Sequence, residues 1–320
     1  MSNKIVSIII VTKGTKHYLS SLINSIKQQS YSDFEIVVID NSVNIDFKRH
    51  ISESYPGITT YTGAKNLFYC EALNKGISLS KGDFILCLND DVTLGKDFIK
   101  ETLKGFNLSK KIGMVSGKIL RADGITLDST GLFLTPMRTA KERGYGKKDT
   151  GKFEKKQYIF GVNGAVAFYR KEMLEAIKLG AEYFDQDFHI FYEDLDIAWR
   201  AQNLGWQAYY VPQAIAYHIR GGTVRACRGI NKRYARHYLN DELTLDLIKN
   251  RYLAIIKNDT LLKFLLYLPI ILVYELFTYT YLLLFRFSLV KKLLRSHILI
   301  KAAFQKRRAL NRISSQINLQ

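Results

Sequence analysis

Short, continuous apolar runs separated by segments of helical composition constrain the fold more than any other feature of this sequence. Three of them lie near the N-terminus: IVSIIIV (5–11), FEIVVID (34–40) and DFILCLN (83–89). Helices are expected near 15–29 and 68–80, between successive runs. Strands that are apolar on both faces and alternate with helices indicate a mostly parallel sheet covered by helices on both sides. The sequence therefore predicts an α/β fold.

Polar residues follow these runs at the predicted strand ends, where α/β sheets bind ligands. The third run ends in Asn89, Asp90 and Asp91. Adjacent carboxylates at a strand end suit a divalent cation that also contacts phosphate, although a turn or a helix cap is the alternative. Asp40 is suited to accept hydrogen bonds from a ribose or a base, or to cap the next helix. The glycine-rich signatures of dinucleotide-binding and P-loop proteins are absent from the sequence.

The second half of the chain gathers further polar groups. Residues 138–156 are polar and basic and predict a mobile loop, 158–170 predict a strand, and 193–205 predict a helix with acids in its first turn. A carboxylate beside aromatic residues at a helix start is suited to act as a general base, or it only stabilises the helix dipole.

Two short strands, WQAYYVP and AIAYH, are predicted next, and the second ends at His218. The segment RGGTVRACRG (220–229) follows and combines arginines with glycines. Flexible backbone with guanidinium groups suits a diphosphate that is covered during reaction and then released.

The C-terminal part is apolar and then strongly basic. Residues 264–285 are the most apolar stretch, and nine Lys or Arg lie between Arg286 and Arg312 in a chain of net charge +18. A polar stripe marks one face of this helix, formed by Lys263, Tyr267, Tyr274, Thr278 and Tyr281. This pattern favours a helix in the membrane interface over a spanning helix, and a buried core helix is a further alternative. An anionic phospholipid surface is the expected partner rather than nucleic acid, because no nucleic-acid-reading motif precedes the basic residues.

The order and spacing of these motifs resemble family 2 glycosyltransferases of the GT-A fold, and most closely their rhamnosyltransferase-like branch. The resemblance covers about residues 4–256. It is carried by VTKG…FEIVVIDNS, KNLFYCEALNKGISLSKGDFILCLNDDV, FGVNGAVAFYRKEML and FYEDLDIAWRAQNLGWQAYYVPQAIAYH. It implies a GT-A catalytic domain at 1–230, with a nucleotide-sugar half (1–125) and an acceptor half (126–230). Residues 231–320 would form a membrane-associating helical region.

The resemblance also implies roles for individual residues and a Mn²⁺ or Mg²⁺ cofactor. Asp194 matches the catalytic base, and Asp91 and His218 match metal ligands. Asn89 stands where the family's metal-binding motif begins with an acid, so it is expected to be a weaker ligand. Donor-binding positions fall on Thr12, Asp40, Lys65, Asn66, Asn89, Asp90 and Arg225. The sugar and acceptor pocket falls on Asn163, Gly164 and Glu193.

The function implied is inverting, metal-dependent transfer of a sugar, rhamnose or another hexose, from a dTDP- or UDP-sugar donor. The expected acceptor is a hydroxyl of a lipid-linked saccharide in cell-surface polysaccharide synthesis. The expected place is the cytoplasmic side of the cell membrane, with peripheral attachment, and the three scattered cysteines fit a reducing compartment. No oligomeric state follows from the sequence. The alternatives are a nucleotidyltransferase and a non-catalytic membrane-binding module with a degenerate sugar-nucleotide pocket.

Overall fold

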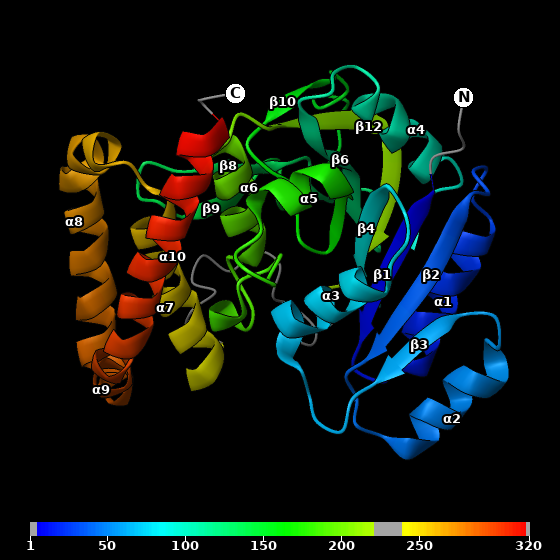
Figure 1. The fold of residues 1–320 in the computed structure, drawn as a ribbon, viewed down its shortest axis with the longest axis horizontal. Helices are drawn as coiled ribbons and strands as arrows, with labels where there is room; N and C mark the ends of the chain where they lie inside the picture. Colours follow the sequence, from blue (N-terminus) through cyan, green and yellow to red (C-terminus); the bar gives the residue numbers. More distant parts are fainter. Residues whose placement is uncertain (1–4, 221–238, 318–320) are drawn as a thin grey trace.

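The computed structural model describes residues 5–220 and 239–317 of the 320-residue chain (Figure 1). Arg225 and most of the predicted arginine- and glycine-containing segment lie outside the described residues.

A parallel sheet forms the first half of the fold. Its strands are β1 (Val6–Thr12), β2 (Phe34–Asp40), β3 (Thr59–Thr62) and β4 (Phe84–Asn89), in the order β4-β1-β2-β3. The helices between them are α1 (Lys16–Lys27), α2 (Ile45–Ser54) and α3 (Phe68–Leu79). The three predicted apolar runs and the two predicted helices are confirmed within a few residues.

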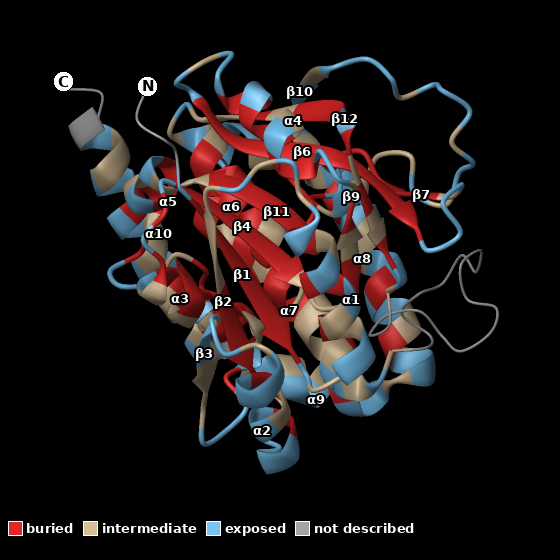
Figure 2. Cartoon of the chain, turned by 90° about the vertical axis from the view of Figure 1, so that its right-hand side faces the viewer, coloured by how far each residue is buried: buried red, intermediate tan, exposed pale blue. Residues whose placement is uncertain are grey.

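The sheet is buried on both faces, which explains why its strands lack polar alternation. In β1, Ile8 and Ile10 pack with side chains of α1, α2 and α4 (Phe98–Phe106). Ile9 and Val11 point the other way, toward α3, α5 (Lys171–Ile177) and α6 (Glu193–Asn203). Figure 2 shows these central strands buried and the helices exposed on their outer faces.

Mixed strand directions mark the second half of the sheet. Its strands are β5 (Val92–Leu94), β6 (Ile112–Arg121), β7 (Leu127–Ser129), β10 (Gln157–Ile159), β11 (Val166–Arg170) and β12 (Gln207–His218). β11 runs antiparallel between β4 and β6, and β12 runs parallel to β6. The predicted α/β class with a C-terminal helical extension is confirmed, with a mixed sheet in this half.

Three local predictions were wrong. Residues 158–170 form two strands, joined by a connection at 160–165 that carries Asn163 and Gly164. The predicted pair WQAYYVP and AIAYH is one strand, β12, whose register shifts between Val211 and Ile215 so that the ladder tolerates Pro212. The predicted loop at 138–156 contains β9 (Ala140–Glu142), which pairs with β8 (Leu132–Leu134).

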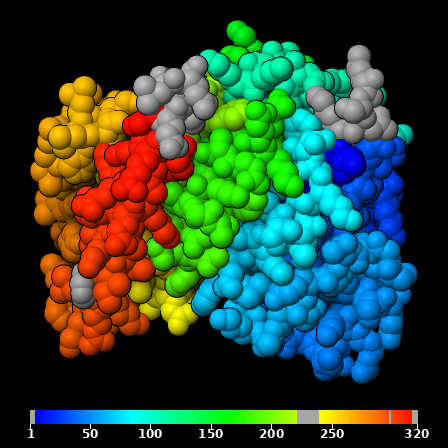
Figure 3. All heavy atoms as spheres, viewed as in Figure 1, coloured from blue at the N-terminus to red at the C-terminus, as the bar shows by residue number. Residues whose placement is uncertain are grey.

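The C-terminal helices pack against the acceptor half (Figures 1 and 3). They are α7 (Asp241–Asn258), α8 (Leu261–Phe285), α9 (Phe287–Arg295) and α10 (His297–Ile317). A short 3₁₀ helix, η1 (Gln186–Phe188), and α6 lie against α7.

The polar stripe of α8 faces the protein. Arg138 stacks over Tyr267 at 4.4 Å, Arg251 of α7 stacks over Tyr274 at 4.5 Å, and Thr278 is buried. The opposite face is apolar and exposed, with Leu262, Leu266, Phe277 and Leu284 each at least 70% exposed. α8 is therefore not the buried core helix that was one alternative.

Candidate functional site

The carboxyl ends of β1 and β4 bring Thr12 and Asp90 together. The Thr12 hydroxyl donates to Asp90 Oδ2 at 2.6 Å, and the Lys13 backbone N–H donates to the same oxygen at 3.3 Å. Burial raises the pKa of Asp90, and the Thr12 hydrogen bond opposes that rise. Two residues predicted on the donor side thus meet at the strand ends, as neighbouring parallel strands require.

Asp40 lies at the neighbouring strand end and is buried. Its carboxylate accepts from the Ser42 backbone N–H at 2.9 Å and the Ser42 hydroxyl at 2.6 Å. Lys65 and Asn66 are exposed in the connection between β3 and α3, and Asn66 Oδ1 accepts from the Phe68 N–H at 2.8 Å. Asn66 thus shapes the start of α3.

Asp91 and His218 form a contact on adjacent strands, as β5 and β12 pair at Val92 and His218. His218 Nε2 lies 3.3 Å from Asp91 Oδ1, while His218 Nδ1 lies 2.9 Å from Asp128 Oδ2. Contacts with both carboxylates outweigh burial and raise the pKa of His218. A carboxylate behind an imidazole is the arrangement that orients metal-binding histidines.

This donor set fits a divalent cation that a substrate helps to hold. One carboxylate and one imidazole converge, and residues 5–220 and 239–317 contain no group of three His, Cys, Asp or Glu able to hold a metal. Mg²⁺ is commonly held by one or two protein carboxylates together with substrate phosphates, and imidazole is a further ligand type for transition metals. Asp91 and His218 are the residues that would hold such a cation.

Tyr69 connects the two halves of the site. Its hydroxyl lies 2.9 Å from Asn89 Oδ1 and 3.0 Å from the Gly164 carbonyl oxygen. Asn89, predicted as the weak position of the metal motif, thus contacts Tyr69. The Asn89 backbone N–H also donates to the Ala165 carbonyl at 3.0 Å, so the donor strand and the acceptor connection are joined twice.

Asp194 lies at the start of α6 and contacts that same connection. Its Oδ2 accepts from the Gly164 N–H at 3.1 Å, and its Oδ1 accepts from the Leu195 N–H at 2.7 Å. A Cβ at Gly164 would lie 3.4 Å from Asp194 Oδ2 and 3.3 Å from Glu193 Oε1, so a larger residue would crowd both carboxylates. The predicted residues Gly164, Glu193 and Asp194 therefore meet.

Three carboxyl groups crowd this part of the site. Burial, with repulsion from Asp194, raises the pKa of Glu193 to about 8 and that of Glu142 to about 7. Burial also raises the pKa of Asp194 above its ordinary value. Asn163, predicted for the sugar pocket, donates from Nδ2 to Glu142 Oε1 at 2.6 Å. A weakly acidic cluster beside a buried amide can exchange protons with a bound hydroxyl group.

Sequence reasoning missed Tyr69, Asp128 and Glu142. Tyr69 belongs to the motif KNLFYCEALNKGISLSKGDFILCLNDDV, but the contacts of its hydroxyl with Asn89 and Gly164 depend on how α3 packs against the second half of the sheet. Asp128 and Glu142 belong to the three-residue strands β7 and β9, whose short patterns carry no distinctive signal.

The sequence profile of Glycosyl transferase family 2 matches residues 7–178, which is more than half of the chain. The protein therefore belongs to glycosyl transferase family 2.

Two curated relatives are bacterial. The amylovoran biosynthesis glycosyltransferase AmsB of Erwinia amylovora is 23% identical over 224 residues, which cover 67% of this chain and 69% of AmsB. The poly-beta-1,6-N-acetyl-D-glucosamine synthase of Staphylococcus epidermidis is 21% identical over 232 residues. That alignment again covers 67% of this chain but only half of the synthase.

Solved structures share the fold at low identity. GalNAc-T7, crystallised with UDP, GalNAc and Mn²⁺, aligns over 79% of this chain and 48% of its own length, with a TM-score of 0.59 and 14% identity. Residues 1–349 of S. aureus TarS with UDP-GlcNAc align over 80% of this chain and 67% of that one, with a TM-score of 0.55 and 16% identity.

Proposed function

We propose that this protein transfers a sugar from a nucleotide-sugar donor to a hydroxyl of a lipid-linked saccharide during bacterial polysaccharide synthesis. Family membership supports a glycosyltransferase, and AmsB and the poly-N-acetylglucosamine synthase are named for polysaccharide synthesis. The donor is a UDP- or dTDP-sugar, with rhamnose among the candidate sugars. TarS in complex with UDP-GlcNAc is a precedent for a uridine diphosphate donor on this fold.

The observation that carries the proposal is the continuous path from Asn89 through Tyr69 and Gly164 to Asp194. The path links the carboxylate of Asp194 to Asn89 at the end of β4, next to Asp90 and Asp91 in the sequence. In this proposal Asp194 accepts the proton of the acceptor hydroxyl, whose oxygen bonds to the anomeric carbon as the bond to the nucleoside diphosphate breaks. Attack from the opposite face inverts the anomeric centre. The raised pKa of Asp194 makes it a stronger base than an exposed aspartate.

Asp91 and His218 would hold Mn²⁺ or Mg²⁺, with Asp128 orienting the imidazole. The cation would neutralise charge that develops on the departing diphosphate. Thr12, Asp40 and Asp90 would contact the nucleotide part of the donor, and Lys65, Asn66 and Arg225 remain proposed donor-binding positions. Asn163, Gly164 and Glu193 would line the sugar and acceptor pocket. We also propose the division into a catalytic domain at 1–230 and a membrane-associating region at 231–320.

Membrane attachment is proposed through the exposed apolar face of α8, with the basic residues of α9 and α10 beside it. α8 is long and apolar enough to cross a membrane, and only 11% of its most apolar window is buried within the protein. We favour a position in the membrane interface on the cytoplasmic side. The polar stripe of α8 packs against the protein, so the exposed apolar face is the one that would meet lipid, and the lysines that follow α8 suit anionic headgroups. Replacing Leu262, Leu266 and Phe277 by serine should reduce co-flotation with vesicles containing anionic lipid; unchanged flotation would contradict the attachment.

A donor screen tests the activity. Full-length protein with Mn²⁺ is incubated with a panel of UDP- and dTDP-sugars, with and without lipid-linked saccharides, and the released nucleoside diphosphate is measured. Asp194→Asn should lower turnover by about 10²–10⁴-fold. Wild-type turnover in that variant would remove Asp194 from the role of base. In a parallel reaction with UTP or dTTP and sugar 1-phosphates, release of inorganic diphosphate would indicate a nucleotidyltransferase, and absence of donor binding would indicate the non-catalytic module.

A further inference from the structure

The turn before α6 has an unusual backbone. His189, Phe191 and Tyr192 have φ values of 58°, 70° and 69°, in the left-handed region that side-chain-bearing residues rarely adopt. Such conformations persist only where the surroundings enforce them, and they concentrate at functional sites. The turn ends one residue before Glu193 and two before Asp194, so its geometry sets where the first turn of α6 points.

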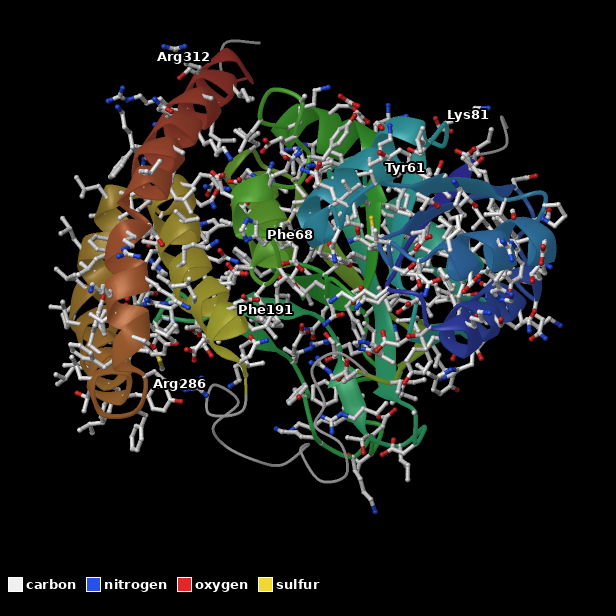
Figure 4. All side chains as sticks on the ribbon, turned by 90° about the horizontal axis from the view of Figure 1, so that it is seen from below. Tyr61, Phe68, Lys81, Phe191, Arg286 and Arg312 are labelled. Atoms are coloured by element: carbon white, nitrogen blue, oxygen red, sulfur yellow. The ribbon has the colours of Figure 1, made fainter. Side chains whose placement is uncertain are left out.

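One buried amide holds most of this turn. Asn250, on α7, is fully buried, and its Nδ2 lies 2.7, 2.8 and 2.8 Å from the carbonyl oxygens of Phe188, Ile190 and Phe191, so that its two N–H groups are shared among three acceptors. The carbonyl between them, that of His189, accepts from the Tyr69 backbone N–H at 3.1 Å. Four consecutive peptide groups are thereby fixed from two sides. Figure 4 shows Phe68 and Phe191 in the region between α3 and the C-terminal helices.

α7 also holds α6 beyond the proposed base. Lys257 is almost fully buried, and its Nζ lies 2.9 Å from Asp196 Oδ1 and also pairs with Asp185. Asn258 donates from Nδ2 to the same Asp196 oxygen at 2.8 Å. Side chains of α7 therefore hold the chain on both sides of Asp194, at residues 188–191 before it and at Asp196 after it.

We propose that Asn250 is a positioning residue for Asp194. Its contacts with three carbonyl oxygens keep His189, Phe191 and Tyr192 in the left-handed conformation that directs the Asp194 carboxylate toward the Gly164 N–H. The proposal rests on the function proposed above, because it takes Asp194 as the base. It assigns a part in the reaction to α7, which lies outside the residues matched by the family profile.

Asn250→Asp is the sharpest test, because it keeps the shape of the side chain and removes its donor. Turnover of full-length protein on the donor selected by the screen should fall by at least about tenfold, since small displacements of a catalytic group cost large factors in rate. The KM for the donor should stay within about twofold, because the strand ends that bind it are not touched. Hydrogen–deuterium exchange of the peptide covering 186–196 should become faster. Asn250→Ser keeps one hydroxyl donor and should lie between the wild type and Asn250→Asp, and it serves if the aspartate variant does not fold.

Asn240→Ala is the matched control. Asn240 caps the same helix by accepting from the Leu243 N–H at 2.8 Å and is exposed. Its loss should lower the melting temperature while turnover and exchange at 186–196 stay unchanged. The proposal is overturned if a folded Asn250 variant keeps wild-type turnover, or if Asn240→Ala reproduces its turnover and exchange changes. Asp194→Asn in the same assay distinguishes the failure of the two proposals. If Asp194→Asn is fully active, Asp194 is not the base. If Asp194→Asn is inactive while Asn250→Asp has wild-type turnover, only the positioning role of Asn250 is refuted.

Discussion

Glu142→Gln should make the protein more stable at alkaline pH than the wild type. Glu142 is partly buried on β9, and burial with the nearby Asp194 charge raises its pKa from 4.5 to about 7. Its two oxygens accept from the Ser129 hydroxyl and from Asn163 Nδ2. Glutamine has the same shape. Its oxygen can accept from Asn163, and its amide N–H can donate to the Ser129 oxygen.

The direction of the change in stability follows from the protonation state of Glu142 in the folded and the unfolded chain. Between pH 4.5 and about 7 the folded protein keeps the Glu142 proton while the unfolded chain has released it. The folded state then binds more protons than the unfolded state, so the free energy of unfolding falls as pH rises through this window and levels off above it. One pKa unit corresponds to about 1.4 kcal/mol, which gives about 3 kcal/mol across the window. This is an upper value, because the side chain keeps some contact with water.

The assay is urea unfolding of wild type and Glu142→Gln at half-unit steps from pH 4.5 to 8.5. The difference between the two free energies of unfolding is the quantity of interest, because groups that lie far from Glu142 titrate alike in both proteins. That difference should move in favour of the variant by up to about 3 kcal/mol as the pH rises. A difference independent of pH would refute the reasoning, since it would mean that Glu142 ionises as it does in the unfolded chain.

Two further outcomes are expected. Asp128→Asn should weaken Mn²⁺ binding about 10–100-fold, measured by calorimetry, because it removes the charge that orients His218. Unchanged affinity would show that His218 does not need Asp128 for metal binding or is not a metal ligand. Asp259→Ala should destabilise the protein by about 3–5 kcal/mol in denaturant unfolding, because it leaves the buried Arg138 without its carboxylate; a change below about 1 kcal/mol would show that water reaches Arg138.

The first half of the sheet could be predicted because its strands are apolar on both faces. Such runs fix the strand ends, and parallel strands bring those ends together, so the meeting of Thr12 with Asp90 follows from the sequence alone. The contact between Asp91 and His218 depends on two pairings of β12. β12 pairs antiparallel with β5, and it pairs parallel with β6 with a register shift beside Pro212. Only the motif resemblance, and not the local pattern, could anticipate it.

Other features depend on contacts that no local pattern encodes. The hydroxyl of Tyr69 reaches Asn89 and Gly164 because α3 is docked against the acceptor connection. The stripe on α8 favoured an interfacial helix but did not indicate which neighbour its polar face meets. In the structure it packs on Arg138 and α7, because buried arginines there take aromatic partners. An amphipathic pattern gives the two faces of a helix but not the neighbour that each one meets.

The buried pairing of Lys257 with Asp185 and Asp196 has a consequence for how this chain can be recombined. A gene fusion that joined the first 230 residues to another enzyme's C-terminal helices would leave buried Asp185 without Lys257 and Lys306, and would leave Asp196 with Arg200 alone. Such a chimera would be expected to fail even if the new helices bound membranes well. The interchangeable unit is therefore longer than the sheet, and it extends through α10, because Lys306 of α10 also pairs with Asp185.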